Sequence, residues 1–331
     1  MKIIAPIRNA EQYSALTGNG AAELYGGLFM PEWYERYGDI LEYNRRGNFG
    51  KQANFTSIEE LRTVLEMCRK DHIDFYLTCN AIFLSSFQRD LLDHLFTSYA
   101  AIGGKHVIVS DAEALSAALK AGCSVTVSSC ADIYNVYSAR FWYEAGARRL
   151  ILPRNTDTET IAEIRRVLPR DCELEVFIMN SICKYSDGMC RSLHNTKAGA
   201  LCSFYDNGRK SYIGKDGNEI TGRMASPMQA ESFFYQQLYA GNSPHGCGQC
   251  AIWDLMNAGV DSLKIVGRLL HTNYLEKTIR LTMQNMKTAE NASSRKEYFE
   301  KMQTGEELLD QNLCRNGYRC YYREIRRGSE K

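Results

Sequence analysis

The stretch His106-Val-Ile-Val-Ser-Asp111, the run that follows it to Gly122, and Ser124-Val-Thr-Val-Ser-Ser129 together indicate the fold. The two outer runs are rich in Val and Ile, which is typical of strands that are buried on both faces. Asp111 is suited to cap a helix that extends through Lys120 and ends at Gly122. The stretch therefore predicts a strand, a helix and a second strand, which is the repeating unit of an α/β fold.

The same alternation recurs along most of the chain. Ser57-Ile-Glu-Glu60 is a capping box, and the apolar residues after it have helical spacing up to Cys68, which we therefore expect in the core. Further helices are expected over Ile161–Leu168 and Leu270–Lys287. The pattern predicts a TIM-like (β/α) barrel, with a doubly wound open sheet as the alternative because strand order is not encoded in the pattern. The predicted strands are Lys2–Ile7, Ala22–Leu28, Asp74–Asn80, His106–Asp111, Ser124–Ser129, Arg149–Arg154, Glu173–Asn180 and Ser262–Arg268.

Composition narrows the class of protein. The chain has 331 residues, of which 44% are hydrophobic, as is ordinary for a globular protein. Its formal net charge of +1 excludes a strong overall positive electrostatic field that would attract nucleic acid or an anionic membrane. No apolar run approaches the roughly 18 residues that a membrane span needs. The N-terminus lacks the long apolar stretch of a signal peptide, so we expect a cytoplasmic, reducing environment in which the 12 cysteines do not form a disulfide framework.

One connection is longer than a barrel needs. About eighty residues separate the last two predicted strands, and loops of that length are often functional. The connection begins at the C-terminal end of a strand, where barrel enzymes place their active sites. We therefore predict a barrel domain over residues 1–290 with a cysteine-rich insertion over 181–250, and a helical C-terminal appendage over 291–331. The insertion contains Cys183, Cys190, Cys202, Cys247 and Cys250, and the appendage contains Cys314 and Cys320.

The cysteines of the insertion indicate a metal site. Cys183 and Cys190 lie in a polar, glycine-containing loop rather than on an apolar helical face. Four thiolates suit an iron–sulfur cluster or zinc. The pair Cys247 and Cys250 has a spacing found both in zinc sites and in redox dithiols. From the residues alone, a metal site and a set of structural or redox thiols remain about equally open.

The run Glu173-Leu-Glu-Val-Phe-Ile-Met-Asn-Ser-Ile-Cys183, followed by Gly188-Met-Cys-Arg-Ser-Leu193, resembles the signature of the collagenase-like peptidase family, unassigned peptidase family thirty-two. The resemblance extends in order over roughly residues 1–290. Similar blocks are Ala5-Pro6, Ala22–Gly27, Asn54-Phe55 and Ala258–Arg268, the last of which resembles the family's Lys-Ile-Glu-Gly-Arg ending.

The resemblance implies a barrel-like catalytic domain and a cofactor. Several members of that family hold a 4Fe-4S cluster on four cysteines and hydroxylate ubiquinone precursors, tRNA uridine or ribosomal RNA cytidine without oxygen, with prephenate implicated as oxygen donor. Carried over to this sequence, the resemblance implies a 4Fe-4S cluster, with zinc as the alternative metal. The implied ligands are Cys183, Cys190, Cys202 and Cys247. Cys250 is the alternative to Cys247 as the fourth ligand.

The sequence also departs from the family pattern. Asn180 stands where the signature usually has Gly, and Asp187 is inserted before Gly188. Val266 replaces the Glu of Lys-Ile-Glu-Gly-Arg, and Asn155 follows Arg154 where the family tends to have Glu. The missing carboxylates put in doubt a direct transfer of any one member's substrate.

Further candidate residues lie at the ends of predicted strands. Arg154, Lys264 and Arg268 would together bind an anionic substrate such as a dicarboxylate, whereas the structural alternative pairs Lys264 with a barrel acid and leaves Arg268 solvated. His194 is a candidate acid–base group, although a hydrogen-bonded loop histidine is the more common case. Asn80 and Ser129 would orient a substrate or satisfy backbone groups at strand ends.

The resulting prediction is an iron–sulfur enzyme that performs oxygen-independent hydroxylation of a small-molecule or RNA substrate with a prephenate-like co-substrate. The alternatives are a peptidase, although no Gly-x-Ser-x-Gly or His-Glu-x-x-His motif is present, and a non-catalytic cluster-bearing subunit of a heterodimer. A homodimer is equally open. RNA is the less favoured substrate, because the candidate RNA-binding patch is short. This patch is Arg319–Arg327 with Tyr321 and Tyr322, and its alternative interpretation is a solvated helix end.

Overall fold

The structure is a computed structural model of the chain. It describes residues 1–38, 41–82, 84–181, 183, 187, 188, 190, 246–305, 317 and 319–326. Within the insertion it also describes the backbone of four short strands, which form two hairpin sheets: β8 (His194–Asn195) with β9 (Gly199–Ala200), and β10 (Tyr212–Ile213) with β11 (Glu219–Ile220).

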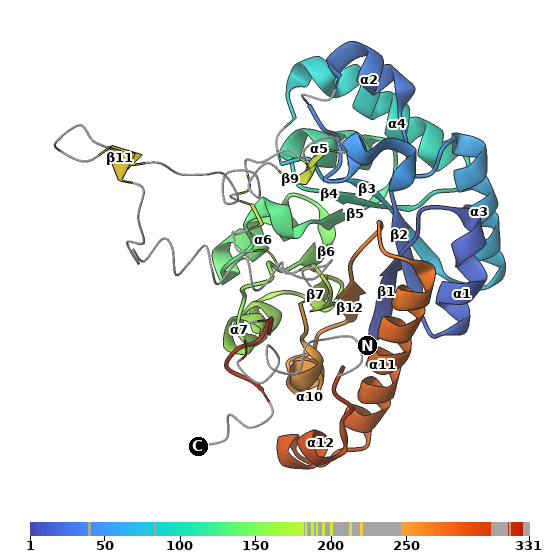
Figure 1. Cartoon of the computed structure of the whole chain (residues 1–331). Helices are drawn as coiled ribbons and strands as arrows, with labels where there is room; N and C mark the ends of the chain where they lie inside the picture. Colours follow the sequence, from blue (N-terminus) through green and yellow to red (C-terminus); the bar gives the residue numbers. More distant parts are fainter. Residues whose placement is uncertain are drawn as a thin grey trace.

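Parallel strands form a closed barrel, with helices around its outside (Figure 1). Because β1 pairs with both β2 and β12, the ring has no open edge, which confirms the TIM-like fold and excludes the open sheet. All eight predicted strands are present. Each strand ends one to three residues before its predicted end, so that Arg154 and Arg268 follow their strands rather than belonging to them. Two starts also differ: β2 begins at Glu23 rather than Ala22, and β6 begins at Ala147, two residues before the predicted Arg149. The barrel strands are β1 (Lys2–Pro6), β2 (Glu23–Gly26), β3 (Asp74–Cys79), β4 (His106–Val109), β5 (Ser124–Val127), β6 (Ala147–Ile151), β7 (Glu173–Met179) and β12 (Ser262–Ile265).

The helices begin largely where the sequence provides caps. Ser57 accepts a hydrogen bond from the Glu60 N–H at the start of α3, and Asp111 caps α5. The predicted last helix of the barrel begins at Thr272 rather than Leu270 and continues to Glu290. The α-helices are α1 (Tyr13–Gly18), α2 (Pro31–Tyr37), α3 (Ile58–Lys70), α4 (Arg89–Ala101), α5 (Ala112–Lys120), α6 (Val136–Glu144), α7 (Thr158–Val167), α10 (Ile252–Asn257), α11 (Thr272–Glu290) and α12 (Arg295–Lys301). In the described parts of the chain, none of the helices combines the length and apolar character that crossing a bilayer requires.

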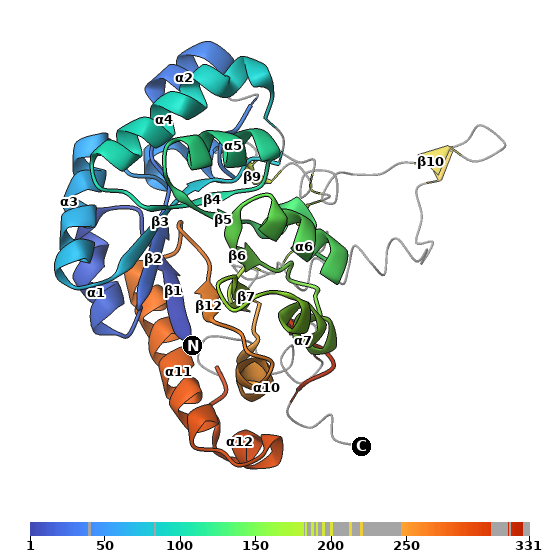
Figure 2. The same ribbon diagram turned by 180° about the vertical axis from the view of Figure 1, so that it is seen from behind.

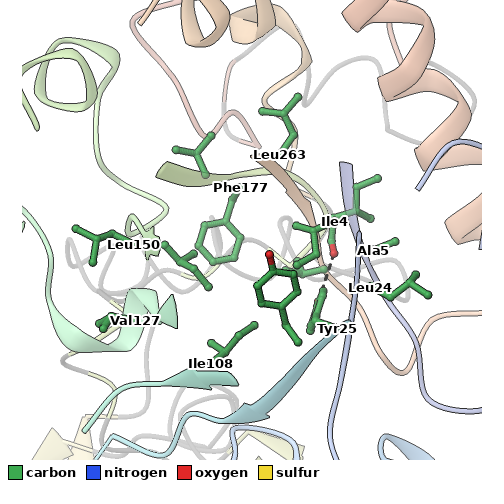
Figure 3. Close-up of a cluster of buried hydrophobic side chains, with 14 of the residues drawn as sticks. Ile4, Ala5, Leu24, Tyr25, Ile108, Val127, Leu150, Phe177 and Leu263 are labelled. Carbon is green, nitrogen blue, oxygen red and sulfur yellow. Dashed lines mark hydrogen bonds between the residues drawn. The ribbon is translucent and has the colours of Figure 1, made fainter. Parts of the chain in front are cut away.

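Residue alternation along the strands divides the core into two layers. Tyr25, Ile108 and Phe177 converge on the centre of the barrel from three different strands (Figure 3). Leu24, on the opposite face of β2 from Tyr25, is fully buried beneath the surrounding helices. Cys68 is also buried, as predicted from its place on the apolar face of α3.

The C-terminal tail returns to the barrel. Cys247 forms isolated β-bridges with Met179, at the end of β7, and with Cys320 of the tail. The carboxylate of Glu324 then accepts a hydrogen bond of 3.0 Å from the Thr158 N–H at the start of α7, and the tail lies beside α7 when the molecule is seen from both sides (Figures 1 and 2). The division into a barrel and a separate appendage therefore remains a prediction, although residues 319–326 pack directly on the barrel.

The expected surface character of this tail is wrong. Tyr321 and Tyr322 are 6% and 3% exposed, and Arg319 is 7% exposed. The segment is thus neither a solvated helix end nor an accessible aromatic platform for RNA, because its aromatic rings form part of the core. Basic residues next to the tyrosines are typical of an exposed segment, so the sequence did not indicate that the tyrosines are buried.

Candidate active site

Loops from several strands meet at the C-terminal end of the barrel. The loop between β2 and α3 contributes Arg45 and Arg46, and the loop after β7 contributes Cys183, Asp187 and Cys190. Because all strands are parallel, their carboxyl ends point to the same face, where barrel enzymes bind substrate. This face, the barrel mouth, is therefore the candidate active site.

Two arginines contact the cysteine loop. A guanidinium nitrogen of Arg45, Nη2, donates a hydrogen bond to Cys190 Sγ at 2.9 Å, and its Nη1 pairs with Glu42. Arg154 pairs with Asp187 and lies 4.2 Å from the centroid of the Phe177 ring. Charge-assisted donors of this kind stabilise negatively charged sulfur, whether as a thiolate or as a metal ligand.

Cys130 lies near the same two arginines but remains a thiol. The loop after β5 places it within electrostatic range of Arg45 and Arg154. Burial raises the pKa of the Cys130 thiol to about 12, against the smaller opposing effect of the arginines. A neighbouring guanidinium is therefore insufficient by itself to ionise a buried cysteine at this face.

The structure places three of the four predicted cysteine ligands. Cys183 and Cys190 lie at the barrel mouth, and the backbone of Cys247 lies between the end of β7 and the tail. Cys202 lies outside the described residues, as does the side chain of His194, whose backbone belongs to β8. Among the described side chains alone, no three His, Cys, Asp or Glu residues are grouped closely enough to hold a metal ion. The predicted ligand set and the role of His194 remain predictions.

Arg268 is buried at the mouth rather than solvated. Its side chain is held by Asn54 Oδ1 at 2.9 Å and Asn44 Oδ1 at 3.1 Å, both from the loop between β2 and α3. In the part of the chain that the structure describes, its hydrogen-bond acceptors are all neutral oxygens, and the third is the carbonyl of Ala53 at 3.4 Å. Burial, together with the charge of Arg46, lowers the pKa of Arg268 to about 10.

Lys264, by contrast, belongs to a charge-balanced network inside the barrel. Its Nζ lies 2.6 Å from Glu175 Oε1 and 4.0 Å from the centroid of the Tyr25 ring. Arg149 binds Glu23 through two hydrogen bonds of 2.7 and 2.8 Å and contacts Glu175 at 3.2 Å. The contacts of Lys264 therefore match the structural alternative, in which this lysine pairs with an acid of the barrel. Its contact with an anionic substrate remains a prediction.

The model of peptidase family U32 matches residues 8–328, which is nearly the whole chain. The chain belongs to peptidase family U32. This confirms the family that the cysteine signature and the Lys264–Arg268 block indicated.

Curated relatives of this U32 chain have different names. The tRNA hydroxylation protein P1 of Bacillus subtilis is 24% identical over 289 residues, which cover 83% of this chain and 60% of the relative. A collagenase of Porphyromonas gingivalis is 26% identical over 212 residues, covering 60% of this chain and 46% of the relative. A solved U32 peptidase aligns with a TM-score of 0.41 and 13% identity over 56% of this chain and 71% of its own. The chain thus spans less than two thirds of the length of these two curated relatives.

One departure of this sequence from the U32 signature has a structural explanation. Asn180, which stands in place of the signature glycine, has a φ of 71°. Left-handed backbone favours glycine, and asparagine is among the few other residues that adopt it readily. The Asn180 Nδ2 donates to the Val266 carbonyl at 3.0 Å, while the buried Oδ1 has no hydrogen-bond partner within the described structure. The substitution therefore preserves the turn that leads from β7 into the cysteine loop.

Replacing Asn180 by alanine is expected to lower the free energy of unfolding by about 1–3 kcal/mol, because it combines left-handed strain with a lost hydrogen bond. Asn180→Gly should cost less than about 1 kcal/mol, since glycine tolerates the backbone and also removes the unpartnered Oδ1. Urea denaturation of both variants measures the difference. Equal destabilisation by the two substitutions would show that the backbone conformation is not the cause.

Sequence reasoning missed several residues of this U32 site. Arg45, Arg46 and Asn44 were not singled out, and Asp187 was noted only as an insertion. The usable signal was two consecutive arginines in a loop that follows a barrel strand. Asn80, which was singled out, accepts a hydrogen bond of 3.2 Å from the Arg45 N–H, so it satisfies a backbone group. On the loop after β5, the residue that caps the short helix is Ser128 rather than Ser129.

Proposed function

We propose that this U32 protein is an oxygen-independent hydroxylase. Cys183, Cys190, Cys202 and Cys247 would hold a 4Fe-4S cluster at the barrel mouth, next to a bound organic acid that supplies the oxygen atom. Several curated relatives are named tRNA hydroxylation proteins, and the hydrogen bond from Arg45 to the Cys190 sulfur supports the proposal most directly.

The residues around the cysteine loop fit such a group. Arg45 donates to one proposed ligand, and Arg154 lies within electrostatic range of another, Cys183. Hydrogen bonds and positive charge around cluster sulfurs tune iron–sulfur sites. The Arg154 Nε and the Asp187 Oδ2 are buried without hydrogen-bond partners among the described residues, which is consistent with a mouth arranged around further polar atoms.

A bound 4Fe-4S cluster would supply one-electron redox chemistry. The residues of the chain would bind and orient the reactants: arginines at the strand ends hold the anionic groups, and the buried aromatic floor of Tyr25 and Phe177 excludes water from below. Arg154, Lys264 and Arg268 remain the proposed anion-binding residues, with His194 as the proposed acid–base group. A small organic substrate and an RNA nucleotide remain open as the hydroxylated molecule.

Anaerobic purification, a visible absorption spectrum and analysis for iron, sulfide and zinc test this proposal. We expect broad absorbance near ~400 nm and about four irons and four sulfides per chain. Cys183→Ser should lose most of both, whereas Cys123→Ser should retain them, because Cys123 is a buried thiol that precedes β5 at the opposite end of the barrel. Comparing Cys247→Ala with Cys250→Ala identifies the fourth ligand.

Two results would contradict the proposal. A colourless protein with one zinc per chain would favour the peptidase activity that the collagenase relative's name suggests. Full iron content in Cys183→Ser would exclude the proposed ligand set. When the cluster is present, anaerobic incubation with prephenate and candidate substrates should produce a mass gain of one oxygen atom, and a requirement for a second, related chain would favour the heterodimer.

A further inference from the structure

Two arginines at the barrel mouth lack a carboxylate partner among the residues that the structure describes. Within these residues, Arg268 donates only to the side-chain oxygens of Asn44 and Asn54 and to a backbone carbonyl. In the same part of the chain, the Arg46 guanidinium donates only to the Arg45 carbonyl, at 3.2 Å, and lies 5.6 Å from the centroid of the Phe49 ring. No ion pair is present for either guanidinium in the part of the chain that the structure describes.

The repulsion between these groups is relieved only in part among the described residues. Burial and the charges of Arg45 and Arg154 lower the pKa of Arg46, and Glu42 opposes them. Glu42 itself pairs with Arg45, and Asp187 pairs with Arg154. Within the described structure, Arg45 and Arg154 therefore have carboxylate partners at the mouth, whereas Arg46 and Arg268 have none.

The barrel interior shows that this imbalance is specific to the mouth. Arg149 is 2% exposed and is surrounded by three glutamates, so that burying its charge is compensated by ion pairs. A buried charge without such compensation carries a large desolvation penalty. A buried arginine that has no compensating carboxylate is well suited to bind an anion that comes from outside the protein.

The second observation is that the surroundings of Arg268 are built to hold it in one position. A Cβ on Gly27 would lie 2.2 Å from Asn54 Oδ1 and 2.5 Å from Arg268 Nη1, so only glycine leaves room for this arrangement. Asn44 and Asn54 are themselves fixed, because the Asn44 Oδ1 accepts from the Arg46 N–H and the Asn54 Nδ2 donates to the Gly50 carbonyl. The guanidinium is therefore preorganised before a ligand binds.

We propose that Arg46 and Arg268 bind a carboxylate group of a small organic acid, with Asn44, Asn54 and Gly27 positioning Arg268. The proposal rests on the proposed function in one respect, since it locates the organic acid of that reaction. Arg46 uses a single donor within the described structure and contacts the carboxylate through the others, while Arg268 supplies the second positive charge. Lys264 and Arg154, the other two residues of the proposed anion-binding set, also contact Glu175 and Asp187, so the subsite itself is formed by Arg46 and Arg268.

A small acid fits this subsite better than an RNA phosphate. Arg268 is 6% exposed and lies behind the loop between β2 and α3, whereas RNA backbones are bound by arginines and lysines on accessible surfaces. A planar carboxylate also matches the fork of a guanidinium. Phosphate and RNA then serve as the comparison ligands in the test.

Isothermal titration calorimetry on the full chain tests the proposal, with succinate and phenylpyruvate as probes and inorganic phosphate and a short single-stranded RNA as comparisons. We expect saturable binding of at least one of the two organic acids. Arg46→Met should weaken it by about 10-fold or more, the loss expected for a charge-assisted contact. The control Arg36→Met, at a surface arginine that pairs with Asp90, should leave it unchanged.

Thermal unfolding without ligand provides a second readout. If Arg46 binds an external anion, Arg46→Met should keep or raise the apo melting temperature, because it removes a partly buried charge that has no carboxylate partner among the described residues, and should abolish the ligand-induced increase. A lower apo melting temperature with unchanged affinity would assign Arg46 a structural role and overturn the proposal. Should Arg46→Met fail to fold, Arg46→Lys is measured instead: it keeps the charge but loses the guanidinium fork, so it should weaken organic-acid binding without lowering the apo melting temperature.

The remaining outcomes separate the subsite from the cluster. No binding of either organic acid by the wild-type chain, or tight binding of RNA that depends on Arg46, would overturn the carboxylate subsite. Carboxylate binding that depends on Arg46 in a protein without iron would support the subsite while contradicting the proposed function. Normal iron and sulfide content in Arg46→Met would show that the lost affinity is not a consequence of a lost cluster.

Discussion

Replacing Arg149 by methionine is expected to lower the free energy of unfolding by about 3–5 kcal/mol, because it leaves carboxylates buried without their partner. Glu23 and Glu175 are both 0% exposed, and Arg149 lies between them. Burial alone would raise the pKa of Glu23, but the hydrogen bonds and charge of Arg149 outweigh it and hold that pKa below its ordinary value. Chemical denaturation of the full chain measures the loss.

The adjacent residue provides a matched control. Arg148 points away from the barrel interior, is about half exposed, and lies 3.9 Å from Asp171. Arg148→Met removes the same charge one position earlier in β6 and should change the free energy of unfolding by less than about 0.5 kcal/mol. Similar losses from the two substitutions would show that net charge, rather than the buried network, determines stability.

The pH dependence of Arg149→Met has a definite sign. In the wild type, the lowered pKa of Glu23 contributes stability above the unfolded-state pKa, and this contribution is lost as the pH falls. Without Arg149, burial raises the pKa of Glu23, so the variant is relatively more stable at low pH and loses that stability as the pH rises. The difference between wild type and variant should therefore be largest near pH ~7 and smaller near pH ~4.

Replacing Tyr322 by alanine is expected to lower the free energy of unfolding by about 3–5 kcal/mol, the usual cost of deleting a large buried aromatic side chain. Tyr322 is 3% exposed, and its hydroxyl donates to the Phe177 carbonyl at 2.9 Å. Its ring packs against Gly248, where an added Cβ would lie 2.8 Å from the ring. The side chain thus joins the tail to β7 and to the segment that contains Cys247.

Tyr322→Phe is the control, and it should cost only about 1 kcal/mol because it removes the hydrogen bond and retains the ring. If residues 291–331 formed an independent appendage, Tyr322→Ala would leave the main unfolding transition of the barrel unchanged. A single transition that shifts as a whole would instead show that the tail and the barrel unfold together. Calorimetry distinguishes the two results and so tests the predicted domain division.

Local pattern was sufficient for most of the architecture. Runs of Val, Ile, Leu and Phe identified the barrel strands, and Ser57 and Asp111 identified two helix starts, because these signals depend on neighbouring residues only. The start of β6 was placed two residues late because Ala147 and Arg148 lack the apolar β-branched character that marks the other strands. Arg149 is buried since glutamates from β2 and β7 surround it, and no local pattern contains that information.

The candidate site divides in the same way. The sequence by itself determined the α/β class, the family, the position of the cysteine loop at the end of β7, and Arg154 and Arg268 as cations near strand ends. Only the tertiary structure decided that the sheet closes and which cations are neutralised, because ion pairing depends on distances between residues that are far apart in the chain. Lys264 meets Glu175 inside the barrel, whereas among the described residues neither Arg46 nor Arg268 meets a carboxylate, and that difference is the basis of the proposed anion subsite.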